Sequence, residues 1–155
     1  MEAVFAAYGE AAYYAHLMEY DLVSVWMLDS VSQGVSRSRQ DLVLFQGDWS
    51  KRTFGQLLAP LQKSHLIPNE IKRFLEQLRL TRNRLMHRFF VEVAQDLKTD
   101  EGRTSAVDVL RQMNSVMEKG EQFISDMLDT YLKDLGVDSD GIRKKVLQEV
   151  LDADI

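Results

Sequence analysis

The chain has 155 residues, of which 45% are hydrophobic and 28% are charged, and its formal net charge at pH 7 is -5. This balance indicates one globular domain that can bury its own core, and it excludes a disordered chain. The absence of cysteine excludes disulfide frameworks, thiolate metal sites and cysteine nucleophiles. Because the three histidines are scattered, a zinc site is not expected, and no pattern indicates a cofactor.

The first residues, Met1–Phe5, lack the basic region and the apolar stretch of a signal peptide. No window approaches eighteen apolar residues without a charge, so no membrane span is expected. We therefore expect a soluble cytoplasmic protein that does not contact a membrane.

Apolar residues recur at three- and four-residue steps through most of the chain, which is typical of amphipathic helices. The expected helices cover residues 3–32, 54–64, 68–90 and 99–135, with a last one after 138. Residues 35–50 are ambiguous between a short helix and a short strand, and we favour the helix. No strand-like alternation persists elsewhere.

Local signals place several helix ends. Thr53 and Gln56 have the spacing of a capping box, and Thr99 is a second N-cap. Gly34 and Gly136 can end the two long helices in left-handed conformation. Together these features predict an all-α fold, an antiparallel bundle of four to five main helices.

The domain organisation follows from the same pattern. Residues 1–136 are expected to form the bundle. Residues 137–155 are expected to form a C-terminal helix that packs on the bundle or on a partner.

Positive charge is concentrated in one place. Between residues 71 and 90 there are six basic residues and one acidic residue, whereas residues 92–155 contain fifteen acidic and eight basic residues. The basic residues are Lys72, Arg73, Arg79, Arg82, Arg84 and Arg88. A basic segment in an acidic protein is either a local anion site or a solvated helix face.

Within this segment, Asn83 and His87 lie one helical turn apart on the same face, whereas Arg82 falls within the apolar stripe. Arginine holds its charge at any working pH, so Arg82 needs a carboxylate, a carbonyl or an anion. It either forms a structural ion pair, with Glu10 or Glu19 of the first helix as acceptor, or it contacts an anion, a carbonyl or water. By this geometry, a second helix or a second subunit is needed to bring Arg82 and His87 to one phosphate.

His87 has two interpretations as well. A histidine in the last turn of a helix can cap carbonyls and interact favourably with the helix dipole. Histidine is also the residue type best suited to general acid–base catalysis near neutral pH.

The sequence of residues 78–90, LRLTRNRLMHRFF, resembles the signature of HEPN domains (higher eukaryotes and prokaryotes nucleotide-binding). In that family four to six residues separate an arginine, often followed by asparagine, from a histidine late in a bundle helix, and here four residues separate Arg82 from His87. The layout around the motif is similar too: Glu19-Tyr20 in a long first helix, a TFGQL segment at 53–57, and an EGR helix start at 101–103. The resemblance covers roughly residues 3 to 130.

The resemblance implies a homodimer whose two motifs face a shared cleft, and a metal-independent endoribonuclease with RNA as its partner. By analogy, His87 would exchange the proton of the ribose 2′-hydroxyl and Arg82 would hold the scissile phosphate. Asn83 would orient His87 or the phosphate. The residues implied to follow the RNA backbone are Arg79, Arg84 and Arg88.

One position departs from a subfamily that is paired with a nucleotidyltransferase antitoxin. That subfamily has a tyrosine two residues after the histidine, where this chain has Phe89. We therefore do not expect this chain to share three properties of that subfamily: action as a toxin, the nucleotidyltransferase partner and modification of the tyrosine. The alternative function is a non-catalytic dimerisation, ligand-binding or regulatory module in which Arg82 is structural and the basic segment docks an acidic partner.

Overall fold

A computed structural model of the chain describes residues 1–35 and 38–138, and within these ranges all regular structure is helical. The elements are α1 (Glu2–Ser32), α2 (Arg39–Trp49), α3 (Phe54–Lys63), α4 (Asn69–His87), α5 (Phe89–Val93), the 3₁₀ turn η1 (Asp96–Lys98) and α6 (Asp100–Asp134). The all-α prediction is thus confirmed for the described residues. The helix expected in residues 139–155 lies outside them.

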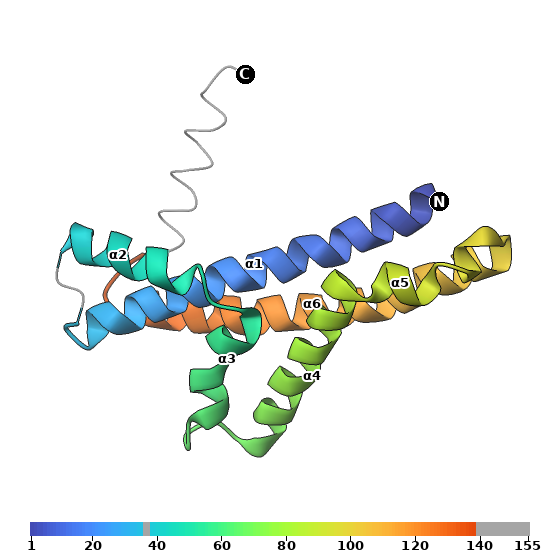
Figure 1. Cartoon of the computed structure of the whole chain (residues 1–155). Helices are drawn as coiled ribbons and strands as arrows, with labels where there is room; N and C mark the ends of the chain where they lie inside the picture. Colours follow the sequence, from blue (N-terminus) through green and yellow to red (C-terminus); the bar gives the residue numbers. More distant parts are fainter. Residues whose placement is uncertain (36–37, 139–155) are drawn as a thin grey trace.

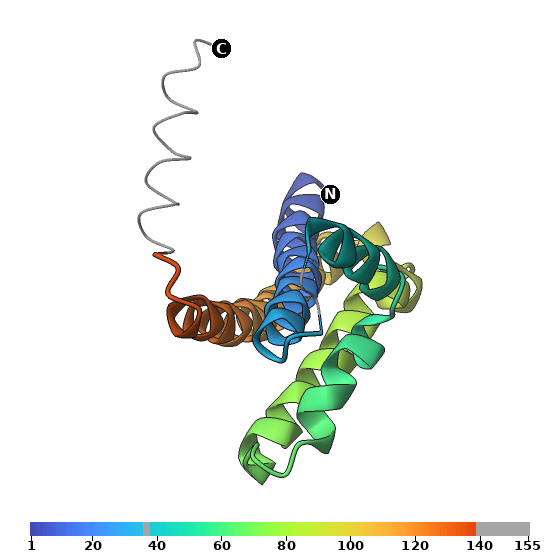
Figure 2. The same cartoon turned by 90° about the vertical axis from the view of Figure 1, so that its left-hand side faces the viewer.

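The two longest helices, α1 and α6, lie side by side along most of their length (Figures 1 and 2). They run in the same direction. At one end the Tyr131 hydroxyl of α6 donates a hydrogen bond to Asp29 Oδ1 of α1, at 3.1 Å. At the other end, Val4 and Asp100 line the same hollow. This parallel pair differs from the antiparallel neighbours that the sequence predicted, because the chain between the two helices returns to the starting end before α6 begins.

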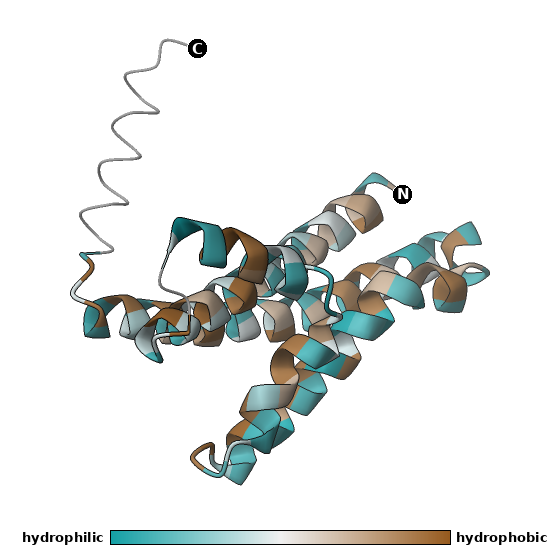
Figure 3. Cartoon of the chain, turned by 60° about the vertical axis from the view of Figure 1, so that its left-hand side comes forward, coloured by the Kyte–Doolittle hydropathy of each residue, from teal (hydrophilic) through white to brown (hydrophobic). Residues whose placement is uncertain are grey.

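The α3–α4 pair is a hairpin that projects from the α1–α6 layer (Figure 2). Its helices are antiparallel: Gln62 near the end of α3 donates a hydrogen bond to Glu76 at 3.2 Å, whereas Gly55 at the start of α3 lies beside Arg79, which is further along α4. Hydrophilic and hydrophobic residues alternate in bands along this hairpin, as expected for helices with one buried face (Figure 3). Its buried face consists of Phe54, Leu57, Leu58, Leu61, Leu75, Leu78 and Leu85.

Three helices approach most closely at Gly120 of α6. A Cβ atom there would lie 2.4 Å from Leu78 Cδ1 of α4 and 2.7 Å from Met18 Sδ of α1. Both neighbouring side chains are fully buried. Close packing therefore explains an interior glycine that lowers helix propensity, because any side chain there would force Leu78 and Met18 to shift.

The helix ends follow the predicted signals. Gly34 and Gly136 both have positive φ, 69° and 72°. Ser38 and Thr53 form capping boxes at the starts of α2 and α3, so the ambiguous segment before residue 50 is a helix. α2 itself has no buried residue.

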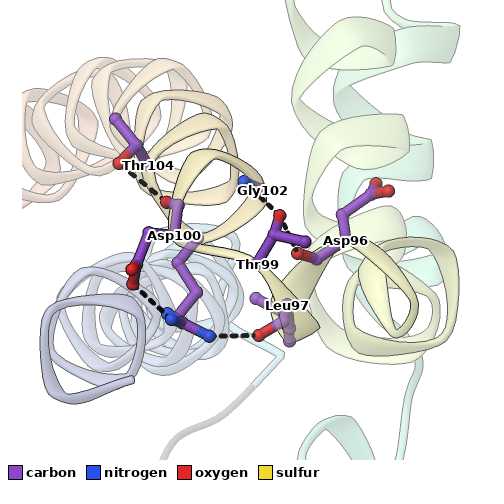
Figure 4. Close-up of polar contacts among 7 residues, drawn as sticks. Asp96, Leu97, Thr99, Asp100, Gly102 and Thr104 are labelled. Atoms are coloured by element: carbon purple, nitrogen blue, oxygen red, sulfur yellow. Dashed lines mark hydrogen bonds and ion pairs between the residues drawn. The ribbon is translucent and has the colours of Figure 1, made fainter.

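The start of α6 shows why glycine occupies position 102 (Figure 4). Thr99 Oγ1 accepts a hydrogen bond from the Gly102 amide at 3.0 Å, which confirms the predicted N-cap. A Cβ atom on Gly102 would lie 1.9 Å from the Asp96 carbonyl oxygen. The 3₁₀ turn therefore folds against the first turn of α6 only because residue 102 has no side chain. Among the described residues, no helix has the length and apolar character needed to cross a membrane.

Candidate functional site

The motif formed by Arg82, Asn83 and His87 lies at the end of α4, where the helix breaks. α4 ends at His87, and Arg88 has φ −129° and ψ −27°, after which α5 begins at Phe89. Phe89 is fully buried and stacks on Tyr8 of α1, with ring centroids 6.2 Å apart. The sequence predicted that this helix runs to 89 or 90 and bends there into residues 91–97. It ends earlier because burying Phe89 against α1 turns the chain at Arg88, which leaves His87 exposed at a fixed corner.

Arg82 connects α1 to the motif. Its Nη2 forms an ion pair with Glu19 Oε1 of α1, and the two side chains are 14% and 27% exposed. Its Nη1 lies 3.3 Å from His87 Nε2 and 3.4 Å from Asn83 Oδ1. The guanidinium carbon is 5.8 Å from the centre of the Phe54 ring. Arg82 thus satisfies the predicted structural pair with Glu19, rather than Glu10, and also contacts both other motif residues.

The contact between Arg82 and His87 defines which form of the imidazole fits the site. Arginine has only donors, so Nη1 can form a hydrogen bond with Nε2 only when that nitrogen carries no proton. The neutral ring with its proton on Nδ1 meets this condition. This is the form in which Nε2 can accept a proton from a substrate.

The prediction that a second helix or subunit must bring Arg82 and His87 together was wrong. They are five positions apart, so their Cα–Cβ directions differ by roughly 140° around the helix. The long arginine side chain nevertheless reaches His87 Nε2 within the same chain. Helical periodicity gives the direction of the Cα–Cβ bond. The arginine side chain is long and flexible, so this direction does not determine the position of its guanidinium.

These residues face a hollow of about 560 Å³ between α1, α3, α4 and the segment before α3, which we call the motif cleft. Its lining residues are Glu19, Arg52, Thr53, Phe54, Gly55, Arg79, Arg82, Asn83, His87 and Arg88. Four arginines therefore surround one carboxylate. This arrangement gives the cleft a positive potential that favours an anion.

Arg79, one of the four arginines that line the cleft, forms an ion pair with Glu76. Its Nη2 lies 2.6 Å from Glu76 Oε1, and its Nε donates a second hydrogen bond to Oε2 at 2.9 Å. This pairing holds the pKa of the Glu76 carboxyl below its usual value and raises the pKa of Arg79. A Cβ atom on Gly55 would be 3.2 Å from Arg79 Cδ, so a glycine at the start of α3 makes room for this side chain.

The three arginines predicted to follow an RNA backbone do not share one surface. Arg79 and Arg88 line the motif cleft, whereas Arg84 lines a separate hollow with Leu80 on another side of α4. Arg84 Nε forms a 2.7 Å ion pair with Glu92 of α5, and Arg88 Nε is 3.8 Å from the other oxygen of that carboxylate. Glu92 therefore braces the corner between α4 and α5.

Arg52 belongs to the motif cleft but was not predicted from the sequence. Its guanidinium lies 4.0 Å from the centre of the Trp49 ring, a cation–π contact. No carboxylate within the described residues forms an ion pair with it. The capping box located the start of α3 at Thr53, but nothing local indicated that this helix start would pack beside α4.

Comparisons of the chain with protein-family models, with curated proteins and with solved structures found no match. Within residues 1–35 and 38–138, no cluster of three or more histidine or acidic residues could hold a metal ion. The function is therefore inferred from the geometry of the motif cleft.

Proposed function

We propose that the protein is a HEPN-like endoribonuclease that cleaves RNA without a metal ion, with Arg82 and His87 as the catalytic pair. The observation that carries this proposal is the 3.3 Å contact between Arg82 Nη1 and His87 Nε2 inside an arginine-lined cleft. An imidazole nitrogen beside a permanently charged guanidinium suits proton abstraction next to a phosphate.

In the proposed reaction, His87 Nε2 accepts the proton of the ribose 2′-hydroxyl. The 2′-oxygen then bonds to phosphorus as the bond to the 5′-oxygen breaks, and a proton returned by His87 neutralises the leaving oxygen. The products are a 2′,3′-cyclic phosphate and a 5′-hydroxyl. Arg82 turns from His87 to a non-bridging phosphate oxygen and stabilises the charge that develops there. Asn83, 3.4 Å from Arg82, orients the guanidinium for this movement.

The proposal includes a cytoplasmic homodimer acting on RNA. Phe5 and Val91 are 57% and 79% exposed, and Phe5 contacts Phe90 just beyond the motif. These exposed apolar side chains next to Phe90 support a second copy of the chain as their cover. Light scattering coupled to gel filtration measures the mass: about twice the monomer supports this part of the proposal, and a monomer contradicts it.

The test is an RNA-cleavage assay in the presence of a metal chelator. We expect the wild-type protein to cut single-stranded RNA and to leave cyclic phosphate ends, and we expect His87→Ala to lose this activity. His65→Ala is the matched control because His65 is exposed in the connector between α3 and α4 and does not line the motif cleft. Equal background from the wild type and His87→Ala would end the nuclease proposal.

The second candidate is a non-catalytic dimerisation or regulatory module, which the Arg82–Glu19 ion pair favours. In that case Arg82 is a structural link between α1 and α4, and the remaining arginines bind an acidic partner. RNA cleavage by the wild type distinguishes the two: its absence, in a protein that Arg82→Met destabilises through the lost Glu19 ion pair, supports the module.

A further inference from the structure

A second hollow adjoins the motif cleft on its α2 side. It has a volume of about 230 Å³ and shares Glu19 and Arg52 with the cleft. The other residues that line it are His16, Tyr20, Val23, Gln46, Ser50 and Leu57. The two hollows therefore lie next to each other, with one carboxylate and one arginine at their border.

The walls of this second hollow differ chemically from those of the cleft. Tyr20 of α1 is 65% exposed, so one aromatic face is open to solvent. Val23 and Leu57 are buried and provide an apolar base. Gln46 of α2 carries both hydrogen-bond donors and an acceptor. A flat aromatic ring, an apolar base and an amide match the requirements of a planar heterocycle that stacks and pairs along its edge.

Arg52 stands where the two hollows meet. The Trp49 ring holds its guanidinium, and no ion pair within the described residues neutralises it. An anion at this border would be held between a phosphate in the cleft and a base in the second hollow. A single nucleic-acid strand has this arrangement: one phosphate in the cleft, the next phosphate at Arg52, and a base beside it in the second hollow.

We propose that the second hollow is a base subsite, in which Tyr20 stacks on an unpaired base of single-stranded RNA next to the scissile phosphate while Arg52 contacts the intervening phosphate. This inference rests on the proposed function because it extends the same cleft. A base inside a duplex is already stacked and cannot reach Tyr20, so the subsite selects single strands.

The test is the binding of a fluorescein-labelled single-stranded RNA to full-length protein carrying His87→Ala, followed by anisotropy. In that background Tyr20→Ala is expected to weaken binding by about 5- to 100-fold, because stacking on an aromatic ring makes a contribution of this size per base. Tyr20→Phe keeps the stacking face and is expected to bind as tightly as the parent. The matched control is Tyr13→Ala, which removes another exposed tyrosine of α1 that does not line either hollow.

Two results would overturn the subsite: Tyr20→Ala binding as tightly as Tyr13→Ala, or Tyr20→Phe losing as much affinity as Tyr20→Ala. Circular dichroism confirms that each variant folds. The outcome is separable from that of the cleavage assay. Tyr20-dependent binding without cleavage by the wild type would leave the subsite standing and remove the nuclease. If the wild type cleaves RNA but Tyr20→Ala binds as tightly as the parent, only the subsite is excluded. If the protein does not bind RNA, both the subsite and the nuclease are excluded.

Discussion

Two neighbouring places on the same pair of helices have opposite character. Leu78 of α4 meets Met18 of α1 and Gly120 of α6, and both side chains are fully buried. One turn further along α4, Arg82 forms an ion pair with Glu19, the residue that follows Met18 on α1. The first contact is apolar and tight. The second is charged and opens onto the motif cleft.

The Leu78 crossing stabilises the packing of the helices, whereas the Arg82–Glu19 pair positions a charged group for the proposed chemistry. At the Leu78 crossing the energy comes from excluded water and close packing, which depend on shape alone. At Arg82 two charges lose part of their hydration, so the pair contributes little net stability but fixes the direction of a guanidinium. If this division is right, substitutions at the crossing change stability most, and substitutions at Arg82 change function most.

The largest expected loss of stability is for Leu78→Ala. Removing a fully buried leucine side chain is expected to lower the free energy of unfolding by about 2–5 kcal/mol. Leu80→Ala, on the same helix but 55% exposed, is the control and is expected to change it by less than about 0.5 kcal/mol. Urea unfolding followed by circular dichroism measures both. Similar losses for the two variants would show that the crossing is not the centre of the core.

Gly120→Ala tests the tightness of the same crossing. The added methyl group overlaps Leu78 and Met18, so we expect destabilisation of about 1–3 kcal/mol despite the higher helix propensity of alanine. Gly9→Ala is the matched control. A Cβ atom there meets nothing within 4 Å, so the propensity gain of up to about 1 kcal/mol is expected to appear as stabilisation. Thermal melts compare the two, and stabilisation by both would contradict the close approach.

The Arg82–Glu19 pair is expected to have an intermediate effect on stability. Arg82→Met leaves a partly buried carboxylate without its partner, which we expect to cost about 1–3 kcal/mol, less than for a fully buried pair because both side chains keep some exposure. A double-mutant cycle with Glu19→Gln is expected to give a coupling energy of about 0.5–2 kcal/mol. The exposed Glu70–Arg73 pair serves as the reference, with a coupling below about 0.5 kcal/mol. Equal couplings for the two pairs would remove the structural role of Arg82.

The smallest expected effect is the pH dependence contributed by Glu76. Its pKa in the folded protein is lowered by Arg79, so the carboxyl stabilises the fold above its ordinary pKa. That contribution is lost as the pH falls through the lowered folded-state value. We therefore expect Glu76→Gln to flatten the acid limb of a stability–pH curve slightly, since both side chains are about one-third or more exposed. An unchanged acid limb would contradict this assignment.

Much of the fold was predictable because its signals are local. Periodicity located α1, α3, α4 and α6, and the caps at Thr53 and Thr99 have the predicted hydrogen bonds. The sequence predicted a bend near residue 90, but it did not place the break at Arg88, because no glycine or proline marks it. It depends on Phe89 packing against Tyr8, a contact eighty-one residues away in the chain. The parallel course of α1 and α6 is a tertiary feature of the same kind.

The candidate site was predictable in composition but not in geometry. Arg82, Asn83 and His87 were identified by spacing, and Glu19 was one of two proposed partners. The sequence did not show that Arg82 contacts Glu19 and His87 at the same time. A helical wheel gives the direction of a side chain but not how far it extends. Arg52 was missed because its position beside the cleft depends on how α3 packs on α4.

The most direct test of the single-chain site is a complementation experiment with Arg82→Met and His87→Ala. The two variants are co-expressed with different tags, and the mixed species is purified through both and assayed for RNA cleavage beside the wild type. Because Arg82 and His87 meet within one chain, neither chain of the mixture holds a complete pair, and we expect no activity above that of either variant alone. Recovery of a substantial fraction of wild-type activity would contradict the account, because it would require the arginine of one chain to serve the histidine of the other.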